Sequence, residues 1–374
     1  MTIEQAKQQV IAAGKRLVEA NLIVRTWGNV SSRLDQDRFL ITPSGRNYLT
    51  LTPAEIVTVN ISDLSYTGKV KPSSERRIHA AVYEHFPEIN FVIHTHQEQA
   101  SIIAASGLDS LPLGEANPLL GREVLCAPYA LPGTGALQRR VTQTLLRAEG
   151  KAVLMQRHGA LCLGRCHEEA FQVAAELERV CGEFIEQRFD WGAEVRQSQL
   201  PVYPKSRRIT GGFSVIDRRG RETEIQLSAD AEDECAEIAA YRAIYTRYSQ
   251  INWVLFDSGP ELVEFSGLGL SLRPLLDDFA QIVGTSVKSV TCEPRRIAAA
   301  LKRSAAVFVQ GLGAVCCGKT KEDARAVAIV TKKASKAYLM AALLNRPRPI
   351  NPLEALLMRF IYQKTYSQLA EKKS

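Results

Sequence analysis

The chain has 374 residues, a formal net charge of +7, 45% hydrophobic residues and 23% charged residues, which allows two domains at about 150 residues each. No apolar run approaches the ~20 residues of a membrane-spanning helix, and the N-terminal segment is too charged for a secretory signal. The 8 scattered cysteines form no CxxC pair, which favours a cytoplasmic protein over a disulfide-stabilised one. Basic residues cluster only at 205–221, where a solvated linker is preferred over a nucleic-acid surface.

The first part of the chain predicts alternating strands and helices, the pattern of an α/β protein. The expected elements are a strand and turn in FLITPSG (39–45), a strand in IVTVNI (56–61), a helix in SSERRIHAAVYEHF (73–86), a strand in NFVIHTH (90–96) and a helix in QASIIAASG (99–107). The helix before Pro87 is amphipathic, because its apolar residues recur at helical spacing on one side.

Three histidines carry the clearest chemical signal. His94 and His96 are two apart in a predicted strand, so both imidazoles point to the same face, as a zinc-type site requires. An isolated HxH is also common at strand ends without a metal, and a lone histidine such as His158 in MQRHGALCLG is more often structural. Together the three offer neutral nitrogen donors and leave coordination positions open for a substrate, which is the catalytic pattern.

Glu75 is the candidate base beside these histidines. It follows Ser73 and Ser74 in KPSSERRIH, at the expected start of a helix. Serines and free backbone N–H groups at a helix start can bind an anion. The alternative is an ordinary N-cap followed by an acid in the first turn, and the two interpretations are compatible.

Two glycine-containing loops are further candidates for anion binding. TWGNVSSR contains Asn29 next to a glycine, and ITPSGRNY offers Ser44 and the amide of Gly45. Each loop alone is a normal turn, so the residues by themselves leave a phosphate-binding role open.

The chain also contains an internal repeat. INFVIHTH (89–96) aligns with INWVLFDS (251–258), and VLMQRHGALCLG (153–164) aligns with VFVQGLGAVCCG (307–318). We therefore expect two copies of one domain, at residues 1–203 and 204–374, joined near residues 197–208.

The second copy lacks the chemistry of the first. All 6 histidines lie at or before His167, and the positions of His94, His96 and His158 are taken by Phe256, Ser258 and Leu312. Glu237 falls opposite Glu75 but has no serine pair, so a helix-surface carboxylate is the preferred interpretation. We expect the second copy to be catalytically dead.

The motifs GNVS, ITPSG, KPSSE, HTH and RHG, in this order over about the first 200 residues, resemble the class II aldolase/adducin family. The resemblance implies an αβα sandwich around an antiparallel-rich sheet of nine strands, present twice in this chain. It also implies that His94, His96 and His158 bind a divalent metal, usually Zn²⁺, and that Glu75 is the catalytic acid/base. Five residues match the positions that hold the substrate phosphate: Asn29, Ser44, Gly45, Ser73 and Ser74.

One departure concerns the proton donor. Fuculose-phosphate enzymes of this family place a tyrosine just after an SLP-like stretch, whereas residues 110–123 contain none. Tyr129, in CAPYALPGTG, lies in a segment that is expected to shape the fold. The proton donor of an aldol cleavage is therefore not identified in the sequence.

The expected function is a metal-dependent aldehyde-lyase that performs retro-aldol cleavage through a metal-bound enediolate. The substrate is a small sugar phosphate or hydroxy-carbonyl compound. Alternatives are an epimerase, dehydratase or decarboxylase on the same scaffold, or a non-catalytic adducin-like interaction protein. The resemblance also implies a homo-oligomer, either a dimer of tandem chains or a tetramer, with the site between subunits.

Overall fold

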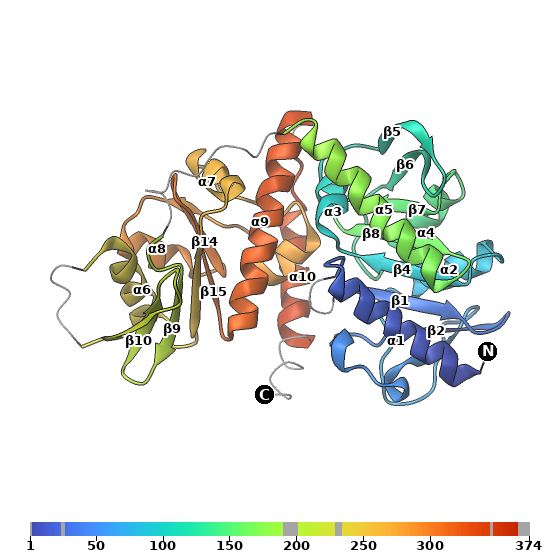
Figure 1. The fold of residues 1–374 in the computed structure, drawn as a ribbon, viewed down its shortest axis with the longest axis horizontal. Helices are drawn as coiled ribbons and strands as arrows, with labels where there is room; N and C mark the ends of the chain where they lie inside the picture. The colour runs from blue at the N-terminus through green and yellow to red at the C-terminus, as the bar shows by residue number, and fades with distance from the viewer. Residues whose placement is uncertain (1, 24–26, 190–200, 229–233, 345–346, 366–374) are drawn as a thin grey trace. The chain divides into compact units, whose positions relative to one another are not determined.

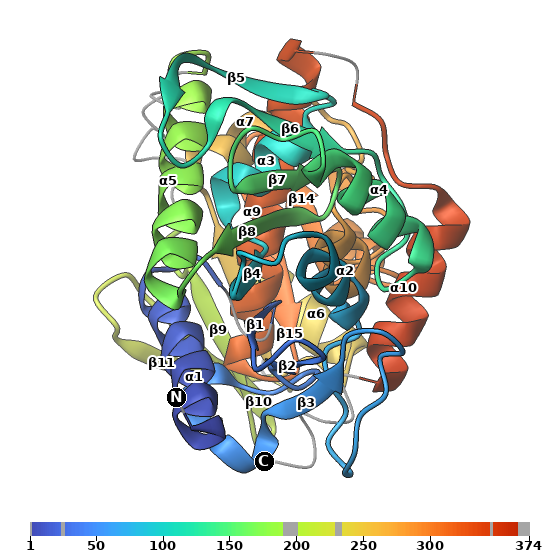
Figure 2. The same ribbon diagram turned by 90° about the vertical axis from the view of Figure 1, so that its right-hand side faces the viewer.

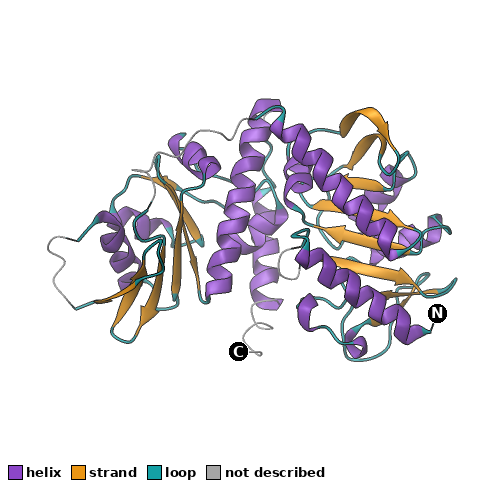
Figure 3. Cartoon of the chain, in the orientation of Figure 1, coloured by secondary structure: helices purple, strands orange, loops and turns teal. Residues whose placement is uncertain are grey.

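The computed structural model describes residues 2–23, 27–189, 201–228, 234–344 and 347–365 (Figure 1). It forms two compact units, one of residues 1–188 with 340–346 and the other of residues 189–339 with 347–374. Each unit combines one large sheet with flanking helices (Figure 3), which confirms the expected α/β class and its presence twice. The expected linker lies partly outside the described residues, and the boundary at residue 203 stays a prediction. No helix in the described part of the chain has the length and hydrophobicity needed to cross a bilayer.

The first unit contains the elements that carry the candidate site. Its helices are α1 (Ile3–Glu19), α2 (Arg76–His85), α3 (Glu98–Ala105), α4 (Gly135–Leu145) and α5 (His167–Glu186), with short 3-10 turns at Tyr48–Thr50 and Pro53–Glu55. Its strands are β1 (Gly28–Arg33), β2 (Arg38–Ile41), β3 (Val57–Asn60), β4 (Phe91–Thr95), β5 (Ser110–Asn117), β6 (Gly121–Ala127), β7 (Ala152–Met155) and β8 (Gly159–Gly164).

These strands pair in the order β3-β2-β1-β4-β8-β7-β6-β5. Every pair is antiparallel except β6 with β7, which is parallel. The antiparallel-rich sheet is as expected, but within the described residues it has eight strands where the resemblance implied nine.

Helices cover both faces of this sheet, with α1 and α5 on one side and α2 and α4 on the other (Figure 2). Val92 packs in the same buried cluster as residues of α2 and α4, such as Ile78 and Leu137. Because strand side chains alternate between faces, His94 projects from β4 on the same side as Val92, toward the start of α2. The sheet therefore orients the first histidine toward Glu75.

The second unit repeats this arrangement with one strand fewer. Its strands are β9 (Lys205–Ile209), β10 (Gly212–Ile216), β11 (Glu222–Gln226), β12 (Trp253–Asp257), β13 (Ser289–Val290), β14 (Ala306–Val309) and β15 (Gly313–Gly318). Its helices are α6 (Ala236–Arg247), α7 (Pro260–Gly267), α8 (Pro294–Ala300), α9 (Lys321–Leu344, of which residues 340–344 are grouped with the first unit) and α10 (Pro352–Thr365), with a π-helical turn at Phe279–Val283.

The order β11-β10-β9-β12-β15-β14-β13 matches the first sheet strand for strand, with no counterpart of β5 among the described residues. The parallel pair at the end of the sheet is also kept, as β13 with β14. The segment between α7 and β13 forms a π-helical turn where the first unit has β5, and this turn contacts α10. The two units thus share one topology, apart from this edge of the sheet.

One partly buried side-chain arrangement is the same in both units. Arg33, at the end of β1, donates to the carbonyl oxygens of Ile89, Tyr83 and Phe86 at 3.0, 2.8 and 3.1 Å. Arg208, at the same place in β9, donates to those of Ile251, Tyr245 and Tyr248 at 3.0, 2.8 and 2.7 Å. The guanidinium also stacks over Tyr83 in the first unit and over Tyr245 in the second. In each unit this arginine satisfies the carbonyls at the C-terminus of the helix that precedes the central strand.

Candidate functional site

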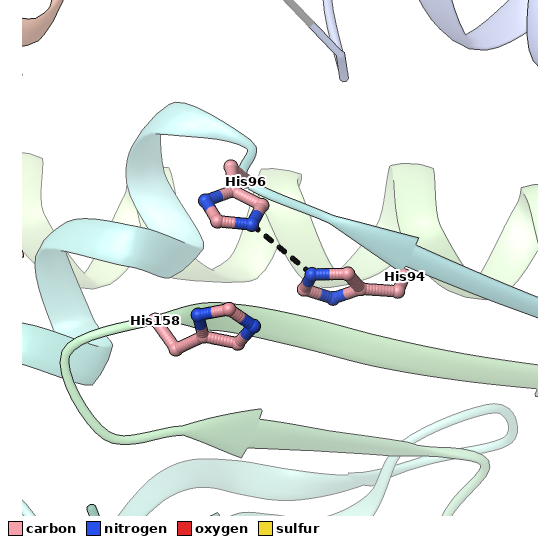
Figure 4. Close-up of side chains that lie close together, drawn as sticks. All are labelled: His94, His96 and His158. Atoms are coloured by element: carbon pink, nitrogen blue, oxygen red, sulfur yellow. Dashed lines mark hydrogen bonds between the residues drawn. The ribbon is translucent and has the colours of Figure 1, made fainter. Parts of the chain in front are cut away.

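The three predicted histidines converge at one end of the first sheet (Figure 4). His94 belongs to β4, His96 lies just beyond its end, and His158 lies in the turn between β7 and β8. One nitrogen from each ring lies within 4.8 Å of those of the other two. Within the described residues this group can hold a metal ion, because three nitrogen donors face one point.

The hydrogen bond of His94 fixes which of its nitrogens can act as a ligand. Its Nδ1 lies 2.8 Å from the carbonyl oxygen of Ala160, which can only accept, so Nδ1 carries the proton. Nε2 is left with its lone pair and lies 3.0 Å from a carboxylate oxygen of Glu75 and 3.1 Å from Nε2 of His96. A backbone carbonyl that orients a histidine in this way is typical of metal sites, so the donor set fits a zinc-type ion.

The turn that presents His158 also has an unusual backbone. The amide of His158 donates to the carbonyl oxygen of Met155, and Arg157 within the turn has a φ of +64°. This left-handed conformation favours glycine and costs other residues roughly 1 kcal/mol or more. The Arg157 guanidinium lies 5.0 Å from the centre of the Tyr129 ring, and this cation–π contact offsets part of the strain.

Glu75 lies against the histidines, with only 7% of its surface exposed. Its carboxylate is 2.7 Å from Nε2 of His158 and 3.0 Å from Nε2 of His94, and it accepts from Nδ2 of Asn29 at 3.0 Å. Burial alone would raise the pKa of Glu75, but the positive charge that His94 and His158 carry when they are protonated holds that pKa well below its usual range. The group is therefore an ionised carboxylate that can accept a proton beside the metal position.

A chain of buried hydrogen bonds holds the amide of Asn29. Nε2 of His79 contacts Oδ1 of Asn29, Nδ1 of His79 lies 2.6 Å from Oγ of Ser31, and that oxygen lies 2.7 Å from the hydroxyl of Tyr83. Since Asn29 donates to Glu75 through Nδ2, its oxygen must accept, and His79 must donate to it. His79 then accepts from Ser31, which accepts from Tyr83, so one neutral histidine tautomer satisfies every group.

Burial keeps His79 in that neutral form. Desolvation, together with the adjoining His94, lowers the pKa of His79 to about 3, although Glu75 acts in the opposite direction. A neutral His79 can orient Asn29 over the whole physiological pH range. His79, Ser31 and Tyr83 were not among the residues predicted from the sequence. The available signal was the spacing of His79 four residues after Glu75, which places both on one side of α2.

The two loops predicted to hold a phosphate are joined to each other by backbone hydrogen bonds. The amide of Ser44 donates to the carbonyl oxygen of Lys71 at 3.0 Å, and the amide of Ser73 donates to that of Thr42 at 3.1 Å. Oγ of Ser73 accepts from the amide of Glu75 at 3.2 Å, and α2 begins only at Arg76 with Glu75 as its N-cap residue. Neither serine therefore occupies the N-cap position that the sequence suggested.

The amides of Ser44 and Ser73 are thus occupied by the protein itself. A phosphate in this region would rely on the hydroxyl groups and on the remaining amides, including that of Gly45, whose φ is +68°. Ser74 is exposed at the same place, and Gly133, in the loop after β6, approaches it closely. The predicted phosphate-binding residues Asn29, Ser44, Gly45, Ser73 and Ser74 consequently come from neighbouring loops and one strand end.

The second unit differs at every one of the histidine positions. Ser258, opposite His96, donates to the carbonyl oxygen of Leu312 at 2.6 Å, so two former ligand positions now bind each other. Glu237 accepts from the amides of Val202 and Tyr203 at 2.9 and 2.8 Å, which anchors the segment before β9. Glu237 is thus a partly exposed carboxylate in the first turn of α6, and it also binds two backbone amides.

The fold and the site together indicate a class II aldolase-type protein. Residues 8–185 and 206–339 each match the family model described as "Class II Aldolase and Adducin N-terminal domain", and the chain belongs to this family. The family expected from the sequence motifs is thereby confirmed, and the two matched regions agree with a tandem repeat.

Relatives of this chain include named aldolases. It is 31% identical over 179 residues to a 5-deoxy-D-ribulose 1-phosphate aldolase of Bacillus thuringiensis, covering 48% of this chain and 83% of that one. It is 34% identical over 175 residues to an L-fuculose phosphate aldolase of Escherichia coli, covering 46% and 78%. A solved L-fuculose 1-phosphate aldolase structure is 29% identical, covers 50% and 88%, and gives a TM-score of 0.47.

Proposed function

We propose that the first copy is a metal-dependent aldehyde-lyase that cleaves a small sugar phosphate by a retro-aldol reaction. The observation that carries this proposal is the convergence of three histidine nitrogens with one buried, ionised carboxylate. The relatives named as aldolases of ketose 1-phosphates support the substrate class.

His94, His96 and His158 would hold the ion, for which Zn²⁺ is our first choice given an all-imidazole donor set. A bound ion of this kind supplies Lewis-acid stabilisation of negative charge on the substrate oxygens. The protein residues supply orientation and proton transfer. The carbonyl of Ala160 orients His94, and β4 fixes the spacing between His94 and His96.

Glu75 is proposed as the catalytic acid/base. In retro-aldol cleavage the proton of the hydroxyl group next to the breaking carbon–carbon bond would pass to the carboxylate, and Glu75 would move a proton to the carbon that the cleavage frees. Its ionised state suits this role, and Asn29 fixes one carboxylate oxygen by a 3.0 Å hydrogen bond. Asn29, Ser44, Gly45, Ser73 and Ser74 would bind the phosphate, so that binding energy far from the reacting carbon orients the substrate.

The second candidate is an epimerase, dehydratase or decarboxylase reaction at the same site. The absence of a tyrosine in residues 110–123 favours it, because the aldolase pattern uses one there to protonate the cleaved substrate. A homo-oligomer, a cytoplasmic location and a catalytically dead second copy remain predictions.

The test is an assay of the purified chain with 5-deoxyribulose 1-phosphate and L-fuculose 1-phosphate. We expect release of dihydroxyacetone phosphate that is lost on chelation and restored by Zn²⁺. If the metal-loaded protein converts these substrates without releasing dihydroxyacetone phosphate, the lyase reaction is refuted and one of the alternative reactions is favoured. A protein that binds metal but converts no ketose phosphate would refute the proposal.

A further inference from the structure

The second unit contains an open cleft of about 790 Å³ that the proposed reaction does not use. It lies between α10, the end of β15 and the segment that follows α8. Four cationic side chains line it, and no aspartate or glutamate does so among the described residues; the cations are Lys302, Arg303, Lys319 and Arg359. Like charges around one cleft repel each other, and a bound anion relieves that repulsion.

Comparison with the first unit shows that the charge of Arg303 is specific to the second. Counted back from the equivalent strands β7 and β14, Arg303 stands where the first unit has Glu149, which pairs with Arg122 at 2.6 Å. Gln250 stands where the first unit has Glu88. The same corner of the fold has therefore exchanged one carboxylate for a cation and another for a neutral amide.

Two of these cations, Lys302 and Arg303, are not neutralised by acids among the described residues. Lys302 and Arg303 are exposed and form no ion pair within the described residues. Arg359 of α10 donates to the carbonyl oxygens of Gln281 and Ile282 at 3.4 and 3.2 Å. These contacts orient its guanidinium, and a guanidinium has five N–H donors, so donors remain for a ligand.

Helix α10 also adds an apolar wall. Leu356 and Phe360 line the cleft and are 54% and 61% exposed, and Tyr248 lines it as well. The described residues of the first unit include no equivalent of α10, and residues 352–365 lie outside the family-model match. A site with cations and an exposed aromatic ring is suited to a ligand that has both an anionic and an apolar part.

We propose that this basic cleft of the second copy binds a small organic anion in which a phosphate or carboxylate is attached to a flat apolar group. The cations bind the anionic group, and Phe360 with Leu356 contacts the apolar group. The second copy would then act as a ligand-binding domain. This inference does not depend on the reaction of the first copy.

Calorimetric titration of the full chain with phenyl phosphate tests the proposal, with inorganic pyrophosphate as a purely anionic probe. We expect saturable binding that weakens as salt is added, because salt screens exposed charges. Arg303→Glu, which restores the charge found in the first unit, should weaken the binding of both probes about tenfold, the equivalent of ~1.4 kcal/mol. Phe360→Ala should weaken the binding of phenyl phosphate severalfold and leave the binding of pyrophosphate unchanged.

Arg295→Glu is the matched control, since this exposed arginine of α8 does not line the cleft. Equal binding by the Arg295→Glu and Arg303→Glu variants would overturn the proposal, as would the absence of saturable binding. A change in molar mass of Arg303→Glu by light scattering, with unchanged probe binding, would make the cleft a contact between chains and would also overturn it. Both altered arginines are exposed, so thermal unfolding should confirm intact folds.

Discussion

The two copies within this chain have the same sheet order, apart from one edge strand, yet among the described residues only the first has a constellation suited to metal chemistry. Shared features maintain the fold, such as Arg33 and Arg208, which bind three helix carbonyls each. Gly159 and Gly313 form another pair, because a Cβ on either would lie 2.2 Å from a carbonyl oxygen of the neighbouring central strand. The comparison separates residues that the fold requires from residues that only the site requires.

The second copy differs from the first at site positions other than those of the three histidines. Pro204 stands opposite Asn29 and cannot replace its amide, and Glu237 is occupied by backbone amides. Tyr241 stands opposite His79 and donates to the carbonyl oxygen of Tyr203. Restoring three histidines alone would therefore leave no oriented carboxylate beside them.

The largest expected effect is on kcat, and it should distinguish Glu75 from Glu237, which stand at equivalent positions in the two copies. Glu75→Gln should lower kcat about a hundredfold or more, because general acid–base catalysis contributes roughly 10²–10⁴ in rate. Bound metal should be retained, since the histidine nitrogens are unchanged. Glu237→Gln is the control and should leave kcat unaltered. Steady-state kinetics on both variants decides the matter, and equal losses would contradict the assignment of one active copy.

The shared arginines should show the opposite behaviour, with equal effects in both copies. Arg33→Ala and Arg208→Ala should each reduce the free energy of unfolding by about 2–4 kcal/mol, because buried carbonyls lose charged donors. Arg38→Ala, which removes a surface pair with Asp35, should cost less than about 1 kcal/mol. Hydrogen exchange resolved by segment would show whether each loss falls in its own unit. A marked effect of only one of the two would refute their equivalence.

The buried His79 should make the first copy sensitive to acid. Its pKa is about 3 in the folded state and near 6.5 when unfolded, so the unfolded state binds more protons between these values. Stability therefore falls as pH decreases below ~6.5, with a limiting slope of about 1.4 kcal/mol per pH unit. Urea unfolding of wild type and His79→Gln at neutral pH and near pH 5.5 would reveal this difference. An identical pH dependence in both proteins would show that His79 is not held neutral.

The smallest expected effect is on stability, and it concerns the turn that precedes His158. Arg157 has a φ of +64°, and Gly311, at the same place in the second copy, has a φ of +69°. Gly311→Arg should cost about 1 kcal/mol of backbone strain, because no contact evolved to offset it. Arg157→Gly should change stability by less than ~0.5 kcal/mol, since relief of strain is balanced by loss of the contact with Tyr129. Thermal unfolding would measure both, and equal shifts would show that the Arg157 contact contributes nothing.

The sequence predicted the central features of the first copy because they follow from local spacing. The two-residue period of β4 was enough to place His94 and His96 on one face, and motif order placed Glu75 beside them. The roles of Ser31 and His79 could not be predicted, because they depend on how β1 packs against α2. The histidines His94, His96 and His158 stay predicted metal ligands. Ser31 and His79 stay predicted positioning residues. The backbone contacts of Glu237 were missed for the same reason, since its partners lie far away in the sequence.

The most direct test of this account is the metal content of the purified chain, measured by inductively coupled plasma mass spectrometry against protein concentration. We expect one equivalent of a divalent metal per chain, reduced to a trace by His158→Leu, which copies the residue of the second unit. Two equivalents per chain would contradict a single site. Metal that remains at full occupancy in His158→Leu would show that His94, His96 and His158 do not form the metal site.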